Sequence, residues 1–218
     1  MITAVFFDVG ETIVDESREY GTWADWLGVP RHTFSAVFGA VIARGLDYRE
    51  TFQVFRTGFD LAVERERRAA VGQPEAFGEE NLYPDARPCL RALREQRLLV
   101  GLAGNQTARA ETILRALDLP VDVIGTSDGW GVEKPSAAFF DRVIAEAGGD
   151  PAAVLYVGDR LDNDIRPAQA AGVHTALIRR GPWGYILDDP DAAQRCLFRI
   201  DSLEELPALV SKYNAAES

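Results

Sequence analysis

Polar residues of types that take part in catalysis or in metal and anion binding follow four apolar runs of the sequence. They are Asp8, Gly104-Asn105, Lys134-Pro135, and Gly158-Asp159 with Asp162, Asn163 and Asp164. Carboxylate oxygens are the ligands that a hard divalent cation prefers, and an ammonium group attracts an anionic substrate. Each segment alone is unspecific, because an Asp after a strand is often a helix cap. Their combination predicts one site for a cation and an anion.

Lys134 stands out because arginine is the usual cation of this chain. Of 23 basic residues only Lys134 and Lys212 are lysines, and Lys212 lies near the end of the sequence. Chance survival of one lysine in a chain of arginine-rich composition is the simple explanation. A specific role for Lys134 beside the acidic residues of the predicted site is the alternative.

These residues need elements that bring them together, and the apolar patterns provide such elements. Several short runs are apolar at nearly every position, which is typical of strands buried on both faces. They are 2–7, 98–103, 121–125, 153–157 and 175–178, with a weaker one at 196–200. Helical patterns lie between the later runs, including one at 106–118. This alternation predicts an α/β fold, a Rossmann-like parallel sheet with helices on both faces. Functional groups then collect at the carboxyl edge of the sheet.

Residues 16–83 interrupt the alternation with three helical patterns in succession. Their stripes are Tyr20, Trp23, Ala24 and Leu27, then Phe34, Val37, Phe38 and Val41, then Phe52, Phe55, Phe59 and Val63. Aromatic residues at helical spacing are typical of a core. We expect a core domain of residues 1–15 and 84–218 and an all-helical module of residues 16–83.

Composition excludes several classes of protein. The 218 residues are 47% hydrophobic and 26% charged, with a formal net charge of −11, which disfavours nucleic-acid and anionic-membrane partners. Two cysteines, Cys89 and Cys196, are too few for a disulfide framework. No basic amino-terminal region precedes the first apolar run, and no apolar run is long enough to span a membrane. We expect a cytoplasmic protein, either a monomer or a homodimer.

The motifs, in their order and spacing, resemble the haloacid dehalogenase (HAD) superfamily, in the subgroup with a helical cap after the first strand. They are Phe6-Phe7-Asp8-Val9-Gly10-Glu11-Thr12, Leu102-Ala103-Gly104-Asn105, Gly131-Val132-Glu133-Lys134-Pro135, and the segment from Val157 to Asp164. The resemblance covers nearly the whole chain. It implies a HAD-like fold in which residues 16–83 form the cap.

The resemblance also implies a catalytic role for Asp8 and a metal site around it. Asp8 would attack phosphorus and form an aspartyl-phosphate, which splits one difficult displacement into two. A Mg²⁺ ion would lie between the two anions, held by Asp8, the Gly10 carbonyl and Asp159, with Asp164 binding through a water.

Phosphoryl binding falls, by the same resemblance, to Lys134 and to the segment after the second strand. Lys134 would offset the phosphate charge and keep Asp8 ionised. Amides around Gly104 and Asn105, at the start of helix 106–118, would bind the phosphoryl oxygens.

Two positions depart from the family pattern. Gly10 stands where phosphatases carry a second Asp as general acid and base, and Gly104 replaces a Ser or Thr. A positioned acid or base contributes ~10²–10⁴-fold, so its loss predicts a slow phosphatase. We expect Glu11 or a water to take over this role. We also expect a preference for leaving groups that need little protonation, such as aryl, acyl or anomeric phosphates.

Three functions remain open. The first is a Mg²⁺-dependent phosphatase of a small phosphorylated metabolite, with the cap closing over the site. The second is a 2-haloacid dehalogenase-type hydrolase, in which Asp8 attacks carbon without a metal; Gly10 is compatible with it, but Asp159 and Asp164 would then have no metal to bind. The third is a non-catalytic relative that binds a ligand or a protein. Removal of metal with EDTA stops only the phosphatase.

Overall fold

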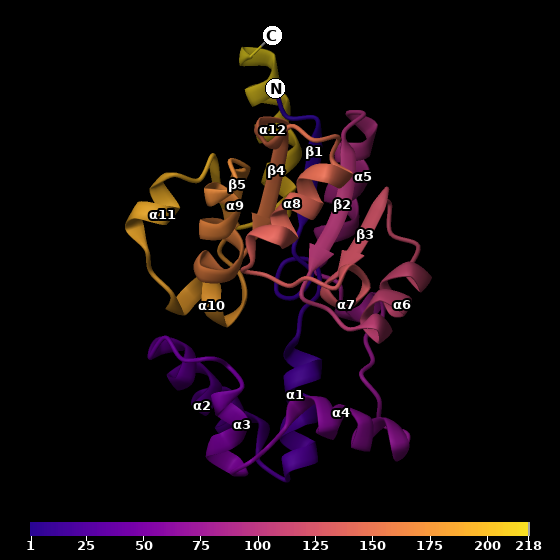
Figure 1. Ribbon diagram of the computed structural model, residues 1–218, viewed down its shortest axis with the longest axis vertical. Coiled ribbons are helices and arrows are strands. Elements are labelled where there is room, and N and C mark those ends of the chain that lie inside the picture. Colours follow the sequence, from indigo (N-terminus) through magenta and orange to yellow (C-terminus); the bar gives the residue numbers. More distant parts are fainter. Residues whose placement is uncertain (218) are drawn as a thin grey trace. The chain divides into compact units, whose positions relative to one another are not determined.

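One parallel sheet of six strands forms the centre of the larger part of the chain (Figure 1). The computed structural model describes residues 1–217. The strand order is β3-β2-β1-β4-β5-β6, and every neighbouring pair is parallel. The strands are β1 (Ala4–Phe7), β2 (Leu99–Gly104), β3 (Val123–Thr126), β4 (Val154–Gly158), β5 (His174–Ile178) and β6 (Phe198–Ile200). The predicted α/β fold with a parallel sheet is confirmed.

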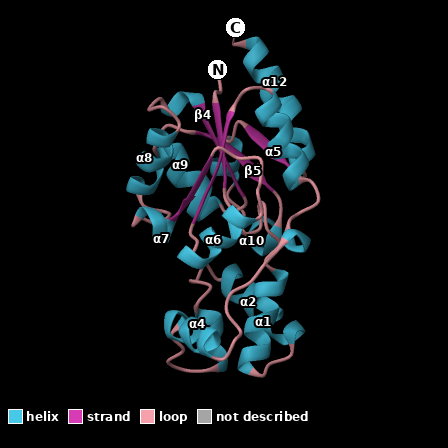
Figure 2. Cartoon of the chain, turned by 90° about the vertical axis from the view of Figure 1, so that its right-hand side faces the viewer, coloured by secondary structure: helices cyan, strands magenta, loops and turns pink. Residues whose placement is uncertain are grey.

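Helices cover both faces of the sheet (Figure 2). On one face Phe6 belongs to a core cluster with Phe139 and Phe140 of α8 (Ala137–Glu146), which lies beside α9 (Arg166–Ala170). On the other face lie α5 (Ala86–Glu95) and α12 (Leu206–Ala216). The continuous apolar pattern of β1 follows from this arrangement, because all four of its residues are buried. Burial of each large apolar side chain contributes about 1.5–3 kcal/mol.

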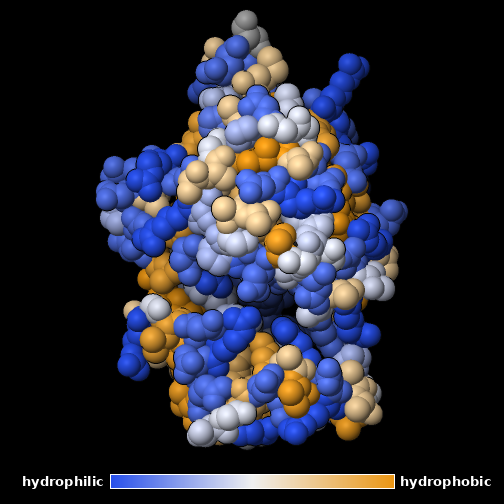
Figure 3. All heavy atoms as spheres, in the orientation of Figure 1, coloured by the Kyte–Doolittle hydropathy of each residue, from blue (hydrophilic) through white to orange (hydrophobic). Residues whose placement is uncertain are grey.

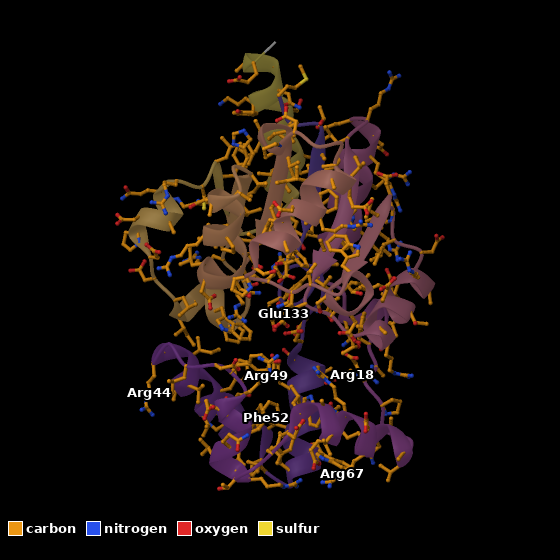
Figure 4. The ribbon with its side chains drawn as sticks, in the orientation of Figure 1. Arg18, Arg44, Arg49, Phe52, Arg67 and Glu133 are labelled. Atoms are coloured by element: carbon orange, nitrogen blue, oxygen red, sulfur yellow. The ribbon has the colours of Figure 1, made fainter. Side chains whose placement is uncertain are left out.

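The sheet register brings the strand ends that carry polar residues to one edge. Phe7 at the end of β1 pairs with Leu102 of β2 and with Val157 of β4. Asp8 therefore follows β1 at the level where β2 and β4 end. Glu133, labelled in Figure 4, belongs to the loop that carries Lys134 to the same edge.

The helix after β2 is shorter than the predicted segment 106–118. This helix, α6, spans Ala108–Ala116 because Thr107 caps it and accepts a hydrogen bond from the Ala110 amide. Short helical segments that the sequence pattern did not reveal are α7 (Ser127–Trp130), α10 (Gly181–Ile186), α11 (Pro190–Gln194), and the single turns η1 (Glu79–Asn81), η2 (Pro151–Ala153) and η3 (Leu161–Ile165). The turn η4 (Leu203–Glu205), capped by Ser202 and Glu205, leads directly into α12.

The chain divides into two compact units. The first contains Met1–Asp15 and the residues from Leu82 onward, and the second is Glu16–Asn81, which we call the helical unit. The second boundary lies two residues before the expected one. Leu82 forms a bridge with Val14, and the Tyr83 amide donates to the Ile13 carbonyl, so both belong to the sheet-containing unit.

The helical unit contains four α-helices where the pattern predicts three. They are α1 (Ser17–Leu27), α2 (Arg31–Ala43), α3 (Glu50–Phe55) and α4 (Leu61–Ala70). The third predicted helix is interrupted because Gly58 adopts a left-handed backbone (φ 76°) and Asp60 caps α4. Phe52, labelled in Figure 4, lies in the aromatic interior, with its ring 5.6 Å from that of Trp23.

Hydrophilic residues dominate the face of each unit seen in Figure 3, and hydrophobic atoms are scattered in small groups. Exposed hydrophobic residues of the helical unit include Leu46, Val54, Val63 and Val71.

No helix within residues 1–217 has both the length and the apolar character that crossing a bilayer requires.

Candidate active site

Lys134 forms the centre of the site, where its ammonium group contacts two carboxylates. Its Nζ lies 2.7 Å from Asp8 Oδ1 and 2.6 Å from Asp164 Oδ1. The lysine is only 2% exposed. Burial alone would lower the pKa of Lys134, but the charges of Asp164 and Asp8 outweigh it and raise the pKa well above its ordinary value. Lys134 therefore remains a cation.

Asn105 and two aromatic residues hold Lys134 in place. The Asn105 side chain accepts a hydrogen bond from the Lys134 amide (2.8 Å) and donates one to the Lys134 carbonyl (2.9 Å). The Lys134 Nζ also lies 5.6 Å and 5.9 Å from the ring centroids of Tyr156 and Phe139. The Asn105 side chain thus fixes the lysine loop, a role that the sequence analysis missed.

Three buried carboxylates gather beside this ammonium group. Oxygens of Asp8, Asp159 and Asp164 lie within 4.8 Å of one another. Burial, followed by the charges of Asp164 and Asp8, raises the pKa of Asp159 well above its ordinary value. Within residues 1–217 no group forms a hydrogen bond with the buried Oδ2 of Asp159. The three carboxylates offer oxygen ligands with excess negative charge, and one of these oxygens has no hydrogen-bond partner. Such a set of ligands fits a hard divalent cation.

Gly158 allows Asp164 to reach this cluster. A Cβ at Gly158 would lie 2.4 Å from Asp164 Oδ2, so the carboxylate packs directly on the end of β4. The same oxygen accepts a hydrogen bond from the Arg160 amide at 3.0 Å. The turn η3 therefore brings the Asp164 carboxylate back toward Asp159.

The loop after Asp8 carries Gly10 and Glu11. It is closed by hydrogen bonds from the Ile13 and Val14 amides to the Val9 carbonyl, each 2.9 Å long. Gly10 lies between Asp8 and Glu11 and forms a bridge with Val14. Gly10 is therefore in the same loop as the predicted nucleophile.

Glu11 is buried, and Tyr83 holds its carboxylate. The Tyr83 hydroxyl donates to Oε2 of Glu11 over 2.6 Å. Glu11 has a left-handed backbone (φ 54°), which costs a residue other than glycine roughly 1–2 kcal/mol. Tyr83 could not be predicted as a partner of Glu11 from the sequence, because 72 positions separate the two residues and no motif connects them.

Arg180 connects this loop to the start of α5. Its guanidinium donates to the Thr12 carbonyl at 3.0 Å and pairs with Asp85 Oδ2 at 2.5 Å. The guanidinium carbon also lies 4.0 Å from the centroid of the Tyr83 ring. Glu11, Tyr83 and Arg180 thus form one network beside the acidic cluster.

The segment from Gly104 to α6 offers fewer amides than the sequence suggests. Gly104 ends β2 beside Asp8. In the first turn of α6, the amide of Ala108 donates to Asp128 and that of Ala110 donates to Thr107. Two amides of the first turn therefore already have partners within the chain, and those of Gly104 and Asn105 precede the helix.

The chain is similar throughout its length to known hydrolases. A family described as "Hydrolase: haloacid dehalogenase-like hydrolase" matches residues 2–172. A ribulose-1,5-bisphosphate 5-phosphatase of Halopiger xanaduensis is 32% identical, with 97% of this chain and 100% of the relative covered. A glyceraldehyde 3-phosphate phosphatase of Methanopyrus kandleri is 29% identical, with 84% and 86% covered.

The fold also matches a solved structure. A magnesium-bound HAD-hydrolase from Bacillus subtilis, YfnB, superposes with a TM-score of 0.69 at 19% identity. The match covers 94% of this chain and 96% of the other. At this identity the comparison shows a shared fold.

Proposed function

Because the chain belongs to the haloacid dehalogenase-like hydrolase family, we propose that it is a Mg²⁺-dependent phosphatase of a small phosphorylated metabolite. The reaction proceeds through an aspartyl-phosphate on Asp8. One observation carries the proposal: Lys134 lies between Asp8 and Asp164, and Asp159 completes a cluster of three carboxylates. This arrangement supplies a nucleophile, oxygen ligands for a cation and a fixed positive charge.

The names of the relatives support the substrate class. The two relatives described above are named as phosphatases of glyceraldehyde 3-phosphate and ribulose-1,5-bisphosphate, both small phosphorylated sugars. A small sugar phosphate is therefore the first class to assay.

The acidic cluster fits Mg²⁺ by its donors. Asp8 and Asp159 would bind the ion directly, the Gly10 carbonyl would add a third ligand, and Asp164 would bind through a water. The unsatisfied Oδ2 of Asp159 supports this assignment, since a buried carboxylate oxygen without a partner is costly. When bound, the ion neutralises part of the charge on the carboxylates and on the phosphoryl group.

Asp8 and Lys134 carry the first half of the reaction. The Asp8 carboxylate attacks phosphorus, and the bond from phosphorus to the leaving oxygen breaks. Lys134 orients Asp8 through their 2.7 Å contact and offsets the charge of the phosphoryl oxygens. Amides around Gly104 and Asn105 bind the same oxygens.

The second half needs a base for the attacking water. Gly10 cannot supply a carboxylate, and Glu11 is the next side chain along the loop. We assign this acid/base role to Glu11 or to a water. Support for Glu11 comes from its charge, which is near enough to contribute to the raised pKa of Asp159.

The proposal is tested with a panel of phosphorylated metabolites and 2-haloacids, assayed with Mg²⁺ and with EDTA. Phosphate release that requires Mg²⁺ and disappears in Asp8→Asn is the expected result. Halide release that persists in EDTA would favour a dehalogenase instead. Turnover of neither class would favour a non-catalytic relative.

A further inference from the structure

The Glu11 side chain is held on two sides. Its Oε2 accepts the 2.6 Å hydrogen bond from Tyr83. Its stem lies against Gly181, where an added Cβ would lie 2.6 Å from both Cβ and Cγ of Glu11. The carboxylate therefore has a defined position three residues after Asp8.

Tyr83 is itself fixed, so the direction of its hydroxyl is defined. The Arg180 guanidinium lies over the tyrosine ring at 4.0 Å, and Arg180 is anchored by Asp85 and the Thr12 carbonyl. Tyr83 is thus part of a network whose other members hold the ring, while its hydroxyl donates to Glu11.

In the hydrogen bond between Tyr83 and Glu11, the phenol is the donor and the carboxylate is the acceptor. Burial, followed by the hydrogen bond with Glu11, raises the pKa of Tyr83 far above its ordinary value, so the phenol keeps its proton. It donates to Glu11, which acts as the acceptor. An ionised carboxylate has two oxygens with about four acceptor sites, so it can accept from Tyr83 and from a water together.

We propose that Tyr83 is a positioning residue that holds the Glu11 carboxylate to take a proton from the water that hydrolyses the aspartyl-phosphate. This inference rests on the proposed phosphatase function. The water oxygen forms a bond to phosphorus, and the bond between phosphorus and the Asp8 oxygen breaks. Inorganic phosphate leaves, Asp8 regains its carboxylate, and the water proton passes to Glu11 and then to bulk water.

The backbone of Glu11 is a second, independent observation. A left-handed residue in a loop is normally glycine, because a side chain is strained there. Here a long acidic side chain occupies that conformation and is buried beside an acidic cluster, where a carboxylate adds repulsion. Strain of this kind is characteristic of sites where the side chain has a function.

The test uses the full chain with Mg²⁺ and p-nitrophenyl phosphate, and follows the first turnover and later turnovers separately. Tyr83→Phe keeps the ring beneath Arg180 and removes only the hydroxyl. Glu11→Gln removes the base. Tyr185→Phe, in α10 and 71% exposed, is the matched control.

We expect Tyr83→Phe and Glu11→Gln to release the first nitrophenolate at the wild-type rate and then to slow. The slowing is at least ~10²-fold for Glu11→Gln and smaller for Tyr83→Phe. Phosphorylated Asp8 then accumulates and is detectable by mass spectrometry. The slowed rate is the same for a second aryl phosphate with a different leaving group, because the leaving group has already departed before the slow hydrolysis of the aspartyl-phosphate. Tyr185→Phe behaves as the wild type.

Unchanged later turnovers in both variants would overturn the inference while leaving the phosphatase assignment intact. Slowing of the first turnover alone would also overturn it, because Tyr83 and Glu11 would then act before the aspartyl-phosphate forms. Failure of the proposed phosphatase function would give other results than these. The wild-type protein would release no nitrophenolate, or Asp8→Asn would release it as fast as the wild type. Either result would contradict the inference as well.

Discussion

Gly104 and Asp8 lie so close together that a side chain cannot be added to the glycine without moving the aspartate. A Cβ at Gly104 would lie 2.6 Å from Asp8 Oδ1. The space that a Ser or Thr side chain would fill is taken by the nucleophile itself.

Gly104→Ser should therefore lower kcat and leave stability nearly unchanged. The displaced group is the end of a side chain, and Lys134 keeps its ion pair with Asp164 when Asp8 turns away, so the buried ammonium is not left without a partner. A misplaced nucleophile reduces the rate by roughly 10²-fold. Steady-state kinetics and urea unfolding measure the two effects. A serine variant that is faster than the wild type would show that the hydroxyl is a missing phosphoryl contact.

Lys134→Arg should not rescue the function of the lysine. Lys134 is 2% exposed, and its compact ammonium contacts Asp8 and Asp164 at 2.7 and 2.6 Å. A planar guanidinium is larger and has a different donor geometry. We expect a loss of roughly 10²–10³-fold in kcat. Lys212→Arg, at the other lysine of the chain and exposed, is the control for the substitution type. Wild-type kcat in Lys134→Arg would refute the role of the lysine.

Asp159→Asn should stabilise the metal-free protein and abolish its response to Mg²⁺. The substitution removes one of three buried like charges and gives Asp8 and Asp164 an amide donor. In the wild type, Mg²⁺ at 100 times its dissociation constant adds about 2.7 kcal/mol to the free energy of unfolding. Thermal unfolding with Mg²⁺ and with EDTA tests both parts. A Mg²⁺-dependent shift of the melting temperature that survives in Asp159→Asn would rule out this ligand.

Asp85→Asn should destabilise the protein near neutral pH but not in acid. Burial favours the neutral carboxyl, but hydrogen bonds from Arg180, Ser202 and Leu203 outweigh it and lower the pKa of Asp85. The stabilisation is then complete above the ordinary pKa of 3.8 and is lost as the pH falls toward the lower folded value. Breaking this nearly buried ion pair costs roughly 3 kcal/mol at pH 7.

Urea unfolding of the wild type and Asp85→Asn between pH 7 and pH 3 measures this difference. It should stay constant down to about pH 5 and shrink below pH 4. A difference that grows with acidity would have the wrong sign and would mean that Asp85 is protonated in the folded protein.

The sheet and the convergence of Asp8, Lys134, Asp159 and Asp164 could be predicted from the sequence for one physical reason. Parallel strands end at one edge, so polar residues after buried apolar runs meet there. The spacing of the helical stripes did not reveal the break between α3 and α4, because Gly58 and Asp60 act through backbone conformation and capping.

The partners of the site residues could not be predicted in the same way. Tyr83 contacts Glu11 across 72 positions, and Asn105 uses its side chain to hold the backbone of Lys134. Such contacts depend on how loops of different elements fold against each other. No periodicity or motif in one sequence specifies them.

The most direct test of the account is binding of beryllium fluoride, which mimics a phosphoryl group on a carboxylate, followed by ¹⁹F NMR. With Mg²⁺ the wild-type protein should give bound fluoride resonances, and these should vanish in Asp8→Asn or after EDTA is added. Resonances that persist in Asp8→Asn, or a wild-type protein that shows none at saturating Mg²⁺, would contradict an active centre built on Asp8.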